Sequence, residues 1–545
     1  MGSSVSSSVG STVDTAVHAA LEQWRLVCGP KYVLSAEAAA AAYGQDTSGS
    51  TRRMVGALRV SHGHDLQAIM RIAHHHKVPV YPISTGHNWG YGSALPVQND
   101  CVILDLSALN RITHFDATLG VVTVQPGVTQ AMLADFLEAG NHPFLVPVTG
   151  AGPSCSLLGN ALERGYGVTP LADHFAAVTD LEAVLPDGSL YRSALREAAG
   201  EELARLFKWG IGPYFTGLFT QSGFGVVTRV TLLLSRRPAC VKVCLFSLKD
   251  DALLESAVDR IHTLLCQLPG TLGGINLMNQ RRVLSMSAPY PADQVGADGV
   301  VPQAVVRAMG QAYQVAPWTG FATLYGTQRM VRAAQQEMKA ALNGLASRVL
   351  FITPERAHQL SRVTQWLPGK TGQRLGGLTA TLAKSLELAA GRPNETALPL
   401  AYWRHPAPPD SALKNPAQDG CGLTWYAPLV PMRSASVRAY AQMVEQITPR
   451  FGIEPLITFT SQGERLFDST VPLLFERDRA GAVAAAAACY EQLFDSGRAQ
   501  GWFPYRLGIE GMAQLATLQQ DSKVFQARLR KDLDPFDLMS PGRYR

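Results

Sequence analysis

Residues 82–93 read Pro-Ile-Ser-Thr-Gly-His-Asn-Trp-Gly-Tyr-Gly-Ser, and they directly follow a short apolar run at residues 78–81. Glycine tolerates positive φ and lets the backbone approach a ligand closely. Consecutive N–H groups in such a turn form a concave anion site that suits a pyrophosphate. A surface turn can have the same composition, so this stretch (the glycine-rich loop) predicts a phosphate site only together with further motifs.

Four later stretches supply those motifs. They are 159–165 (Gly-Asn-Ala-Leu-Glu-Arg-Gly), 207–214 (Phe-Lys-Trp-Gly-Ile-Gly-Pro-Tyr), 219–228 (Phe-Thr-Gln-Ser-Gly-Phe-Gly-Val-Val-Thr), and the tail Asp534-Pro535 with 540–543 (Ser-Pro-Gly-Arg). In this order and at these separations, the five blocks resemble the vanillyl-alcohol oxidase and para-cresol methylhydroxylase (PCMH) family of FAD-dependent oxidoreductases. The resemblance extends from about residue 55 to the C-terminus and implies FAD as the cofactor.

The composition argues against several other classes of protein. A hydrophobic share of 46% with 17% charged residues is typical of a soluble globular protein, and 545 residues indicate about two to four domains. A net charge of +5 without a basic cluster that contains aromatic residues argues against nucleic-acid binding. No apolar run reaches the roughly 18 residues of a membrane span. The eight cysteines lack the spacing of a zinc site, so we expect no metal and mostly buried, reduced thiols.

The serine-rich start of the chain, residues 1–13, lacks both a basic region and an apolar region. It is therefore interpreted as a disordered lead-in rather than a secretion signal, and the expected location is the cytoplasm.

Short β-branched runs alternate with helical segments over residues 55–238, which is typical of a mixed α/β or α+β domain. The pattern predicts strands at 57–61, 78–83, 102–106 and 120–124, and helices at 65–77 and 129–139, the second ending at Gly140. The alanine tracts 36–42 and 482–488 predict packed helices, and the proline-rich stretches 289–302 and 393–416 predict loops.

The resemblance implies an α+β fold, with a two-part FAD-binding domain (PCMH-type) and an α/β cap domain built on an antiparallel sheet. The divisions expected from it are an N-terminal segment at 1–54, the FAD-binding domain at 55–238, the cap or substrate domain at 239–512, and a C-terminal return to the FAD-binding domain at 513–545.

Three residues match catalytic positions of the family: Tyr91, Tyr505 and Arg506. An arginine in a water-poor cleft stabilises a phenolate and an anionic reduced flavin, since it cannot give up its charge. Two tyrosine hydroxyls and a guanidinium that converge on a substrate phenol would lower its pKa. The implied reaction is deprotonation of the phenol and hydride transfer from its benzylic carbon to flavin N5, which leaves a quinone methide.

The same resemblance implies a set of cofactor-binding residues. They are Ser84, Thr85, Gly86, His87, Asn88, Gly90, Gly92, Ser93, Pro147, Gly159, Asn160, Gly165, Gly167, Gly225, Val227 and Arg543.

The chain departs from the family where relatives carry a histidyl flavin link in the cap, because Gly422 occupies that position. Two other anchors are open. His87 follows Gly86, where more distant flavoproteins of this fold attach a histidine to the 8α carbon, and a neutral imidazole is a suitable nucleophile. The alternative for His87 is a hydrogen bond to the pyrophosphate. Tyr426, on the same strand as Gly422, is the less favoured covalent candidate.

Two further departures concern the acid–base residues. Oxidases of the family place an aspartate after a Val-Pro pair, whereas this chain has Val148 followed by Thr149. The family's later histidine pair is replaced by Phe467 and Asp468. Asp468 is interpreted as a solvated loop residue in preference to a displaced base.

Two histidine motifs are assigned no catalytic role. Residues 74–76 are three consecutive histidines on a predicted helix, where side chains lie about 100° apart and cannot chelate one metal. The Asp173-His174 pair follows the glycine-rich block 165–170 and is expected to order a loop.

The sequence leaves three functions open. The leading one is oxidation of a para-substituted phenol or an aryl or allylic alcohol. The others are oxidation of a non-phenolic alcohol or natural product, and flavin binding without turnover. The oxidant, dioxygen or a protein electron carrier, is also open, and a homodimer that binds a small-molecule substrate is expected.

Overall fold

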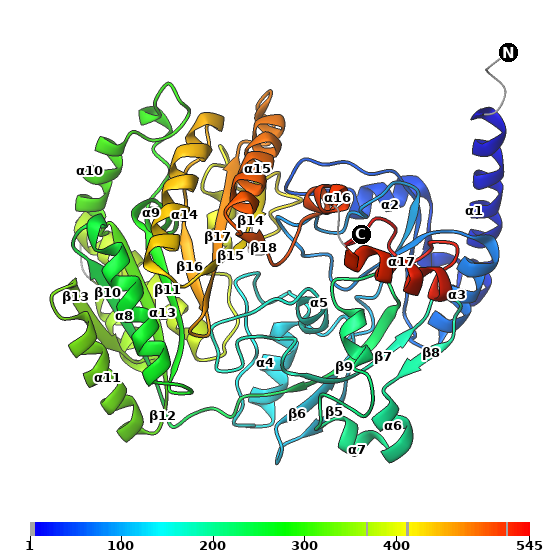
Figure 1. The fold of residues 1–545 in the computed structure, drawn as a ribbon, viewed down its shortest axis with the longest axis horizontal. Coiled ribbons are helices and arrows are strands. Elements are labelled where there is room, and N and C mark those ends of the chain that lie inside the picture. The colour runs from blue at the N-terminus through cyan, green and yellow to red at the C-terminus, as the bar shows by residue number, and fades with distance from the viewer. Residues whose placement is uncertain (1–5, 367–368, 410–413, 519–520) are drawn as a thin grey trace.

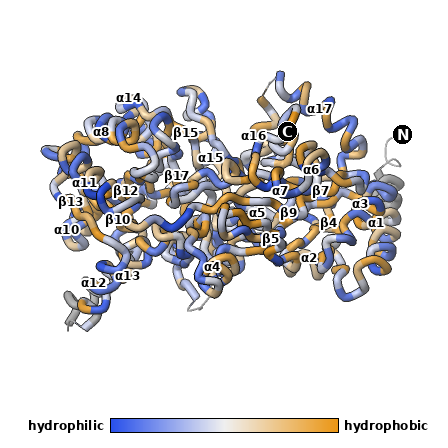
Figure 2. Tube along the Cα trace, turned by 90° about the horizontal axis from the view of Figure 1, so that it is seen from below, coloured by the Kyte–Doolittle hydropathy of each residue, from blue (hydrophilic) through white to orange (hydrophobic). Residues whose placement is uncertain are grey.

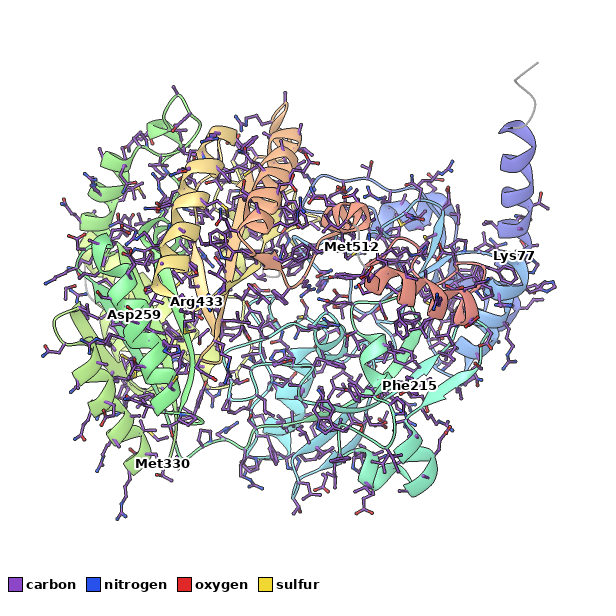
Figure 3. The ribbon with its side chains drawn as sticks, in the orientation of Figure 1. Lys77, Phe215, Asp259, Met330, Arg433 and Met512 are labelled. Carbon is purple, nitrogen blue, oxygen red and sulfur yellow. The ribbon has the colours of Figure 1, made fainter. Side chains whose placement is uncertain are left out.

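The computed structural model describes residues 6–366, 369–409, 414–518 and 521–545. Figure 1 shows two lobes side by side, one containing both termini and the other built on a large sheet. Met512, on α16 (Ile509–Thr517), lies where the lobes meet (Figure 3). Seen from below, the paired helices α12 (Pro354–Gln365) and α13 (Gly369–Ala389) project from the large-sheet lobe (Figure 2).

The glycine-rich loop leaves the end of a mostly parallel sheet. Its strands are, in spatial order, β1 (Val33–Leu34), β2 (Met54–Arg59), β4 (Cys101–Asp105) and β3 (Val80–Ile83). β2, β4 and β3 run parallel and β1 is antiparallel to β2. Residues Cys101 to Leu104 are fully buried, because a parallel sheet is covered on both faces. The loop begins at the carboxyl end of β3, where sheets of this kind place their ligands.

A second sheet in the same lobe is antiparallel. Its order is β5 (Ile112–Asp116), β6 (Val121–Val124), β9 (Val226–Leu233), β7 (Val178–Val184) and β8 (Leu190–Arg192). The predicted helix at 129–139 is confirmed as α4 (Gln130–Ala139): Thr129 Oγ1 accepts from Met132 N–H at its start, and Gly140 ends it. A short helix, α5 (Leu157–Leu162), follows and faces the other lobe.

The second lobe is built on one large antiparallel sheet. Its strands are β13 (Ala346–Ile352), β10 (Cys240–Leu248), β12 (Trp318–Gly326), β11 (Leu272–Asn279), β16 (Thr458–Gln462), β17 (Leu466–Phe475), β15 (Pro428–Pro431) and β18 (Phe503–Pro504), with β14 (Gly422–Tyr426) also paired to β17. Four helices cover its outer face: α8 (Leu254–Gln267), α11 (Gln328–Leu342), α14 (Ser434–Ile447) and α15 (Ala482–Ala499). The opposite face is directed toward the first lobe (Figure 1).

In the described part of the chain, eight further α-helices complete the two lobes. They are α1 (Ser6–Cys28), α2 (Ala36–Tyr43), α3 (Asp65–His76), α6 (Ala194–Ala199), α7 (Glu201–Ala204), α9 (Gln280–Ser287), α10 (Gln303–Tyr313) and α17 (Asp521–Leu533). Lys77, at the end of α3, and Phe215 lie far from the large sheet (Figure 3).

The C-terminal tail returns to the first sheet. Val80 N–H donates to the Leu538 carbonyl (2.8 Å), and Ser540 N–H donates to the Val80 carbonyl (2.9 Å), so the tail lies beside β3. The Asp534 carboxylate accepts from the N–H groups of Leu538 and Met539, both at 2.8 Å. These bonds explain the Asp-Pro motif: the aspartate fixes the turn that presents Arg543 to the space between the lobes.

One expectation about the start of the chain needs correction. Residues 6–13 belong to α1, whereas a disordered lead-in was expected; residues 1–5 lie outside the described residues. The helix is anchored farther along by Trp24, whose Nε1–H donates to the Ile69 carbonyl of α3 (3.0 Å). The expected domain division stays a prediction; its boundaries after residues 54 and 512 fall within β2 and α16.

Over the described ranges, no helix has the length and apolar character required to cross a membrane. All eight cysteines are free thiols, and five of them are buried.

Candidate active site

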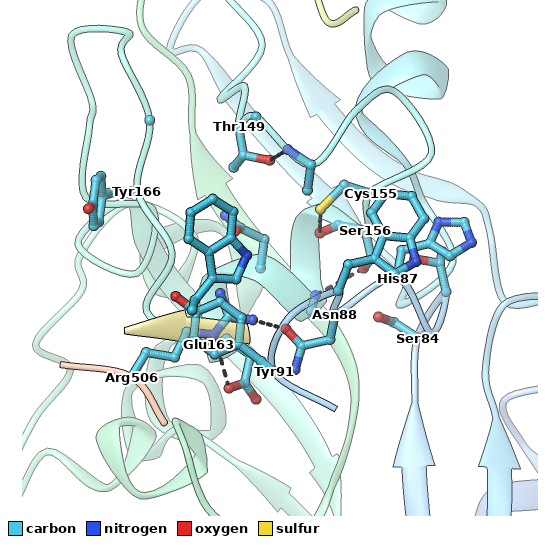
Figure 4. Close-up of a pocket in the computed structure, with 18 of the residues that line it drawn as sticks. Ser84, His87, Asn88, Tyr91, Thr149, Cys155, Ser156, Glu163, Tyr166 and Arg506 are labelled. Atoms are coloured by element: carbon cyan, nitrogen blue, oxygen red, sulfur yellow. Dashed lines mark hydrogen bonds and ion pairs between the residues drawn. The ribbon is translucent and has the colours of Figure 1, made fainter. Parts of the chain in front are cut away.

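A cavity of about 560 Å³ lies between the lobes. Ligand sites typically measure roughly 300–1,000 Å³. The first lobe lines it with the glycine-rich loop, α5 and the tail, and the second lobe lines it with β11, β16, β17, α9 and residues 396–401. Figure 4 shows part of this wall, with Ser84 and His87 from the loop near Ser156 of the α5 N-cap.

The glycine-rich loop presents unused backbone donors to the cavity. The N–H groups of Tyr91 and Ser93 donate to the Asn88 carbonyl (3.0 Å each), which closes the turn. The N–H groups of residues 85–88 have no acceptor among the described residues, and all four residues line the cavity. A row of N–H groups without an internal acceptor at a cavity wall is the arrangement that binds an anion, so this row fits a bound phosphate. The residues present therefore fit the pyrophosphate of FAD.

The glycines of the loop have a second role, which is to allow the lobes to pack. Gly90 has a φ of +78°, and a Cβ there would lie 2.2 Å from Cδ1 of Trp425 in β14. Its N–H donates to Thr47 Oγ1 (2.8 Å), and the Trp425 N–H donates to its carbonyl (3.2 Å). Gly90 thus connects the loop to the cap and does not itself line the cavity.

One glutamate neutralises two arginines at the cavity wall. Glu163, which directly follows α5, forms an ion pair with Arg543 of the tail and lies 3.7 Å from Nε of Arg506. Arg506 also donates to the Asn88 side-chain carbonyl, and Arg543 donates to the Tyr81 hydroxyl (2.8 Å). Figure 4 shows Arg506, Glu163 and Asn88 as one cluster. Because these groups are largely buried, their charges interact strongly.

Arg506 also lies against the predicted tyrosines. Its guanidinium carbon is 4.4 Å from the centre of the Tyr91 ring, a cation–π contact. Burial raises the pKa of Tyr91 above its ordinary range, while Arg506 and a hydrogen bond from Tyr505 lower it in part. Burial likewise raises the pKa of Tyr505. Both phenols therefore stay protonated and act as hydrogen-bond donors.

Asp468 is the clearest difference from expectation. It was interpreted as a solvated loop residue, but it lies on β17 and is fully buried. Strand alternation places Phe467 in the core under the helices, while Asp468 pairs with Thr460, a cavity residue, on the opposite face. Neither carboxylate oxygen has a hydrogen-bond partner among the described residues.

Burial raises the pKa of Asp468 well above its ordinary value, and the carboxyl group lies near enough to Tyr91 and Tyr505 to raise their pKa values. The structure thus favours a neutral acid at this position. A neutral acid can donate a proton or a hydrogen bond, whereas a displaced base would have to be ionised.

His87 lines the cavity and stacks on Trp89, with ring centres 4.8 Å apart. Burial lowers its pKa, an effect that a hydrogen bond to the Ser154 backbone partly offsets. Its Nδ1 is buried without a partner among the described residues. A neutral imidazole with an unpaired nitrogen is compatible with either predicted role, which is covalent attachment to the 8α carbon of a flavin or a hydrogen bond to its pyrophosphate.

The second covalent candidate, Tyr426, is wrong. Its ring is fully buried in the core under the helices, and its hydroxyl donates to the Leu493 carbonyl (2.9 Å). Leu423 and Trp425 are the residues of β14 that line the cavity, because side chains alternate along a strand and Tyr426 therefore points the other way. The structure also explains Gly422, where a Cβ would lie 2.1 Å from the Phe475 carbonyl oxygen.

The other predicted residues divide into two groups. Those that line the cavity are Ser84, Thr85, Gly86, His87, Asn88, Tyr91, Ser93, Gly159, Asn160, Gly167, Gly225, Val227, Arg506 and Arg543. Those outside its lining are Gly90, Gly92, Pro147, Gly165 and Tyr505. Thr149, at the position after the absent aspartate, lines the cavity and exchanges two hydrogen bonds with the Gln130 amide (2.9 Å each).

The two histidine motifs differ in their surroundings. His174 is buried against Asn160, and burial lowers its pKa to about 4, so it supports the cavity wall as a neutral ring. Residues 74–76 end α3, and among the described residues no group of three or more potential ligands is arranged to hold a metal.

Sequence reasoning missed Glu163, Trp425 and Arg282. Glu163 was visible within the block 159–165, but its charge partners are distant in sequence. Arg282 had no local signal, since an arginine on a short helix usually indicates a solvated surface.

Comparison with known proteins relates the chain to flavoproteins. The FAD binding domain family matches residues 56–194. The chain is 34% identical to 1'-carboxy-chondrochloren decarboxylase of Chondromyces crocatus over 96% of both chains. It is 26% identical to the 4-cresol dehydrogenase [hydroxylating] flavoprotein subunit of Pseudomonas putida, over 88% of this chain and 85% of that one.

Solved structures share the whole fold. The crystal structure of p-cresol methylhydroxylase with substrate bound has a TM-score of 0.85 at 23% identity, over 97% of both chains. The 4-ethylphenol oxidase of Gulosibacter chungangensis, in complex with isoeugenol, has a TM-score of 0.86 at 21% identity over the same shares.

Proposed function

Because this chain belongs to the vanillyl-alcohol oxidase and para-cresol methylhydroxylase family of FAD-dependent oxidoreductases, we propose that it removes a hydride from the benzylic carbon of a para-substituted phenol or from an aryl or allylic alcohol. FAD is its cofactor and supplies the two-electron acceptor, flavin N5, when bound.

The observation that carries this proposal is the position of Arg506. Its guanidinium lies on the Tyr91 ring at the cavity wall, and Tyr505 lies near enough to Tyr91 to lower the pKa of its hydroxyl in part. In our proposal Arg506 holds a substrate phenolate by charge, and the Tyr91 hydroxyl donates a hydrogen bond to its oxygen. Tyr505, which lies outside the cavity lining, acts on the substrate through Tyr91. Loss of hydride is then favoured because the phenolate ring donates electrons to the benzylic carbon.

Asp468 has a proton-holding role in this proposal. It is buried near both tyrosines and favours the neutral form, so in our proposal it keeps its proton and adds no negative charge that would oppose a bound phenolate. The row of N–H groups at residues 85–88 and the guanidinium of Arg543 are assigned to the cofactor.

For His87 we propose covalent attachment to the 8α carbon of the flavin, supported by its lowered pKa and unpaired Nδ1. Acid precipitation of the yellow protein tests for this bond, because covalently bound flavin stays with the precipitated protein. Flavin that stays with the wild-type pellet but is released from His87→Ala supports the link, and flavin released from the wild-type protein removes it.

A second candidate is oxidative decarboxylation, which the 34% identity to a decarboxylase favours. A hydride leaves the benzylic carbon of a phenol whose side chain carries a carboxylate. The electron pair of the bond to the carboxylate then forms an alkene, carbon dioxide departs, and the ring regains its phenolate. Carbon dioxide released in step with flavin reduction would support this candidate, and full retention of the carboxylate would exclude it.

The test of the main proposal is Arg506→Ala, with Arg506→Lys as the matched charge-retaining variant. We expect Arg506→Ala to retain flavin and to lose flavin reduction by a para-alkylphenol by about 10²–10³-fold or more, the size of a lost transition-state charge contact. Arg506→Lys should be intermediate, because it keeps the charge without the planar fork. Rapid mixing under anaerobic conditions measures the rate, and near-normal reduction of Arg506→Ala would remove this mechanism.

The proposal also covers the size of the substrate, the oxidant, the oligomeric state and the cellular location. We propose a small-molecule substrate, dioxygen or a protein electron carrier as the oxidant, a homodimer and a cytoplasmic location. An oxygen electrode distinguishes the two oxidants, since dioxygen uptake with substrate alone requires an oxidase.

A further inference from the structure

Arg282 lies in the cavity without a counter-charge. It is on α9, about nine-tenths buried, and lines the cavity on the side of the large sheet. Its Nε and Nη1 atoms are buried without a hydrogen-bond partner, and no carboxylate of the described residues lies within ion-pair distance. Burial alone lowers its pKa to about 10, so the guanidinium stays charged at neutral pH.

This arrangement differs from that of the other two cavity arginines. Arg506 and Arg543 share Glu163, the one acidic side chain among the described residues that line the cavity. A buried cation without a partner is unfavourable, and proteins pair such groups or neutralise them. An unpaired guanidinium that faces a cavity therefore indicates an anionic ligand.

The surroundings of Arg282 are built and rigid. Asn279 caps α9, and its Oδ1 accepts from the N–H groups of Arg282 (3.0 Å) and Ile457 (3.2 Å). This oxygen joins the first turn of α9 to the start of β16. The next residue of β16, Thr458, also lines the cavity, and its hydroxyl is buried without a partner among the described residues. The unpartnered guanidinium and the unpartnered hydroxyl thus come from two cavity-lining segments that Asn279 holds together.

The pairing of β16 with β17 shows how far Thr458 lies along the sheet from Asp468, the residue near the two tyrosines. Thr458 pairs with Thr470, and Thr460 pairs with Asp468, which lies near Tyr91 and Tyr505. The two pairs are two residues apart along the strands, about 7 Å at the usual rise per residue. A phenol ring with a short side chain can span this separation.

We propose that Arg282 and Thr458 form a subsite for a carboxylate on the substrate's side chain, with Arg282 as the counter-ion. The placement of the phenol end rests on the proposed function. The substrate class is therefore a para-hydroxyphenyl compound with a carboxylate a few bonds from the benzylic carbon.

The test compares 3-(4-hydroxyphenyl)propanoate with its neutral amide, 3-(4-hydroxyphenyl)propanamide. Calorimetric titration of the holoenzyme, its flavin reduced with dithionite so that neither probe turns over, gives both dissociation constants. The variants are Arg282→Met, Arg282→Lys, and the control Arg307→Met, which removes an exposed charge from α10. Flavin content confirms that each variant is folded.

We expect the wild-type protein to bind the carboxylate at least about tenfold more tightly than the amide, because a charged hydrogen-bonded pair is formed. Arg282→Met should bring the ratio to about one through weaker carboxylate binding, and Arg307→Met should leave it unchanged. Arg282→Lys should still bind the carboxylate more tightly than the amide, but by a smaller factor than the wild-type protein. This variant tests the subsite if Arg282→Met does not fold. Equal affinities in the wild-type protein, or a preference that survives in Arg282→Met, would overturn the subsite.

Oxidation of neutral 4-propylphenol separates this inference from the proposed function. In Arg282→Met the rate of 4-propylphenol oxidation relative to that of 3-(4-hydroxyphenyl)propanoate should rise, because only the carboxylate probe uses the subsite, and in Arg307→Met this ratio should equal that of the wild-type protein. Failure of the wild-type protein to oxidise any para-alkylphenol would defeat the phenol chemistry, and the Arg282-dependent preference in the titration would still be measurable.

Discussion

Replacing Asp468 by asparagine should change how the stability of the protein depends on pH. The side chain is fully buried, and neither oxygen has a partner among the described residues. Burial raises the pKa of its carboxyl group well above the ordinary value, so the folded protein keeps a proton that the unfolded chain releases above about pH 4. Between the unfolded and folded pKa values, the free energy of unfolding therefore falls as pH rises.

The size of the effect follows from linkage. One extra bound proton in the folded state gives a slope of about 1.4 kcal/mol per pH unit. Asparagine has nearly the same shape and does not titrate, so Asp468→Asn lacks this slope. The free energy of unfolding of the variant, minus that of the wild-type protein, should rise by about 1.4 kcal/mol per unit above pH 4 until the folded pKa is reached. Any cost of burying the amide is independent of pH and changes only the intercept.

Urea unfolding followed by tryptophan fluorescence, with saturating FAD, measures this difference at half-unit steps from pH 4.5 to 7. Asp532→Asn, which removes an exposed carboxylate from α17, is the matched control. If the free energy of unfolding of Asp468→Asn minus that of the wild-type protein stays constant over this range, Asp468 is ionised in the folded protein. The proton-holding role assigned to it would then be wrong.

Two further variants test the contact between the lobes. Glu163→Gln leaves Arg506 and Arg543 without a shared counter-charge, so we expect a loss of about 3–5 kcal/mol in stability. Chemical unfolding with and without FAD measures it, and a loss below about 1 kcal/mol would contradict the role of this carboxylate. Gly90→Ala places a methyl group 2.2 Å from the Trp425 ring at a φ of +78°. It should weaken FAD binding at least tenfold in a fluorescence titration, and unchanged affinity would show that the lobes can separate without affecting the cofactor.

Several features of the protein could be predicted from its sequence because neighbouring residues encode them. The capped helix after Thr129, the helix before Lys77 and the turn-rich loop at residues 82–93 depend on local periodicity, side-chain caps and positive φ. The five motif blocks were enough to identify the family and FAD, since each block forms its own turn or strand end.

The charge network of the site was decided by tertiary structure alone. Glu163 and Arg543 are 380 residues apart, and they meet only because the tail returns beside β3. No local sequence pattern predicts such a pairing.

The sequence by itself determined several strands and helices of the first lobe and singled out the glycine-rich loop that we propose for the cofactor. Only the tertiary structure decided that Asp468 and Arg282 are buried. In a strand with alternating side chains, the polar face normally meets water, and here the docking of the first lobe covers it. Whether a charged side chain is solvated or enclosed depends on what packs over it, and that packing brings together residues from the whole chain.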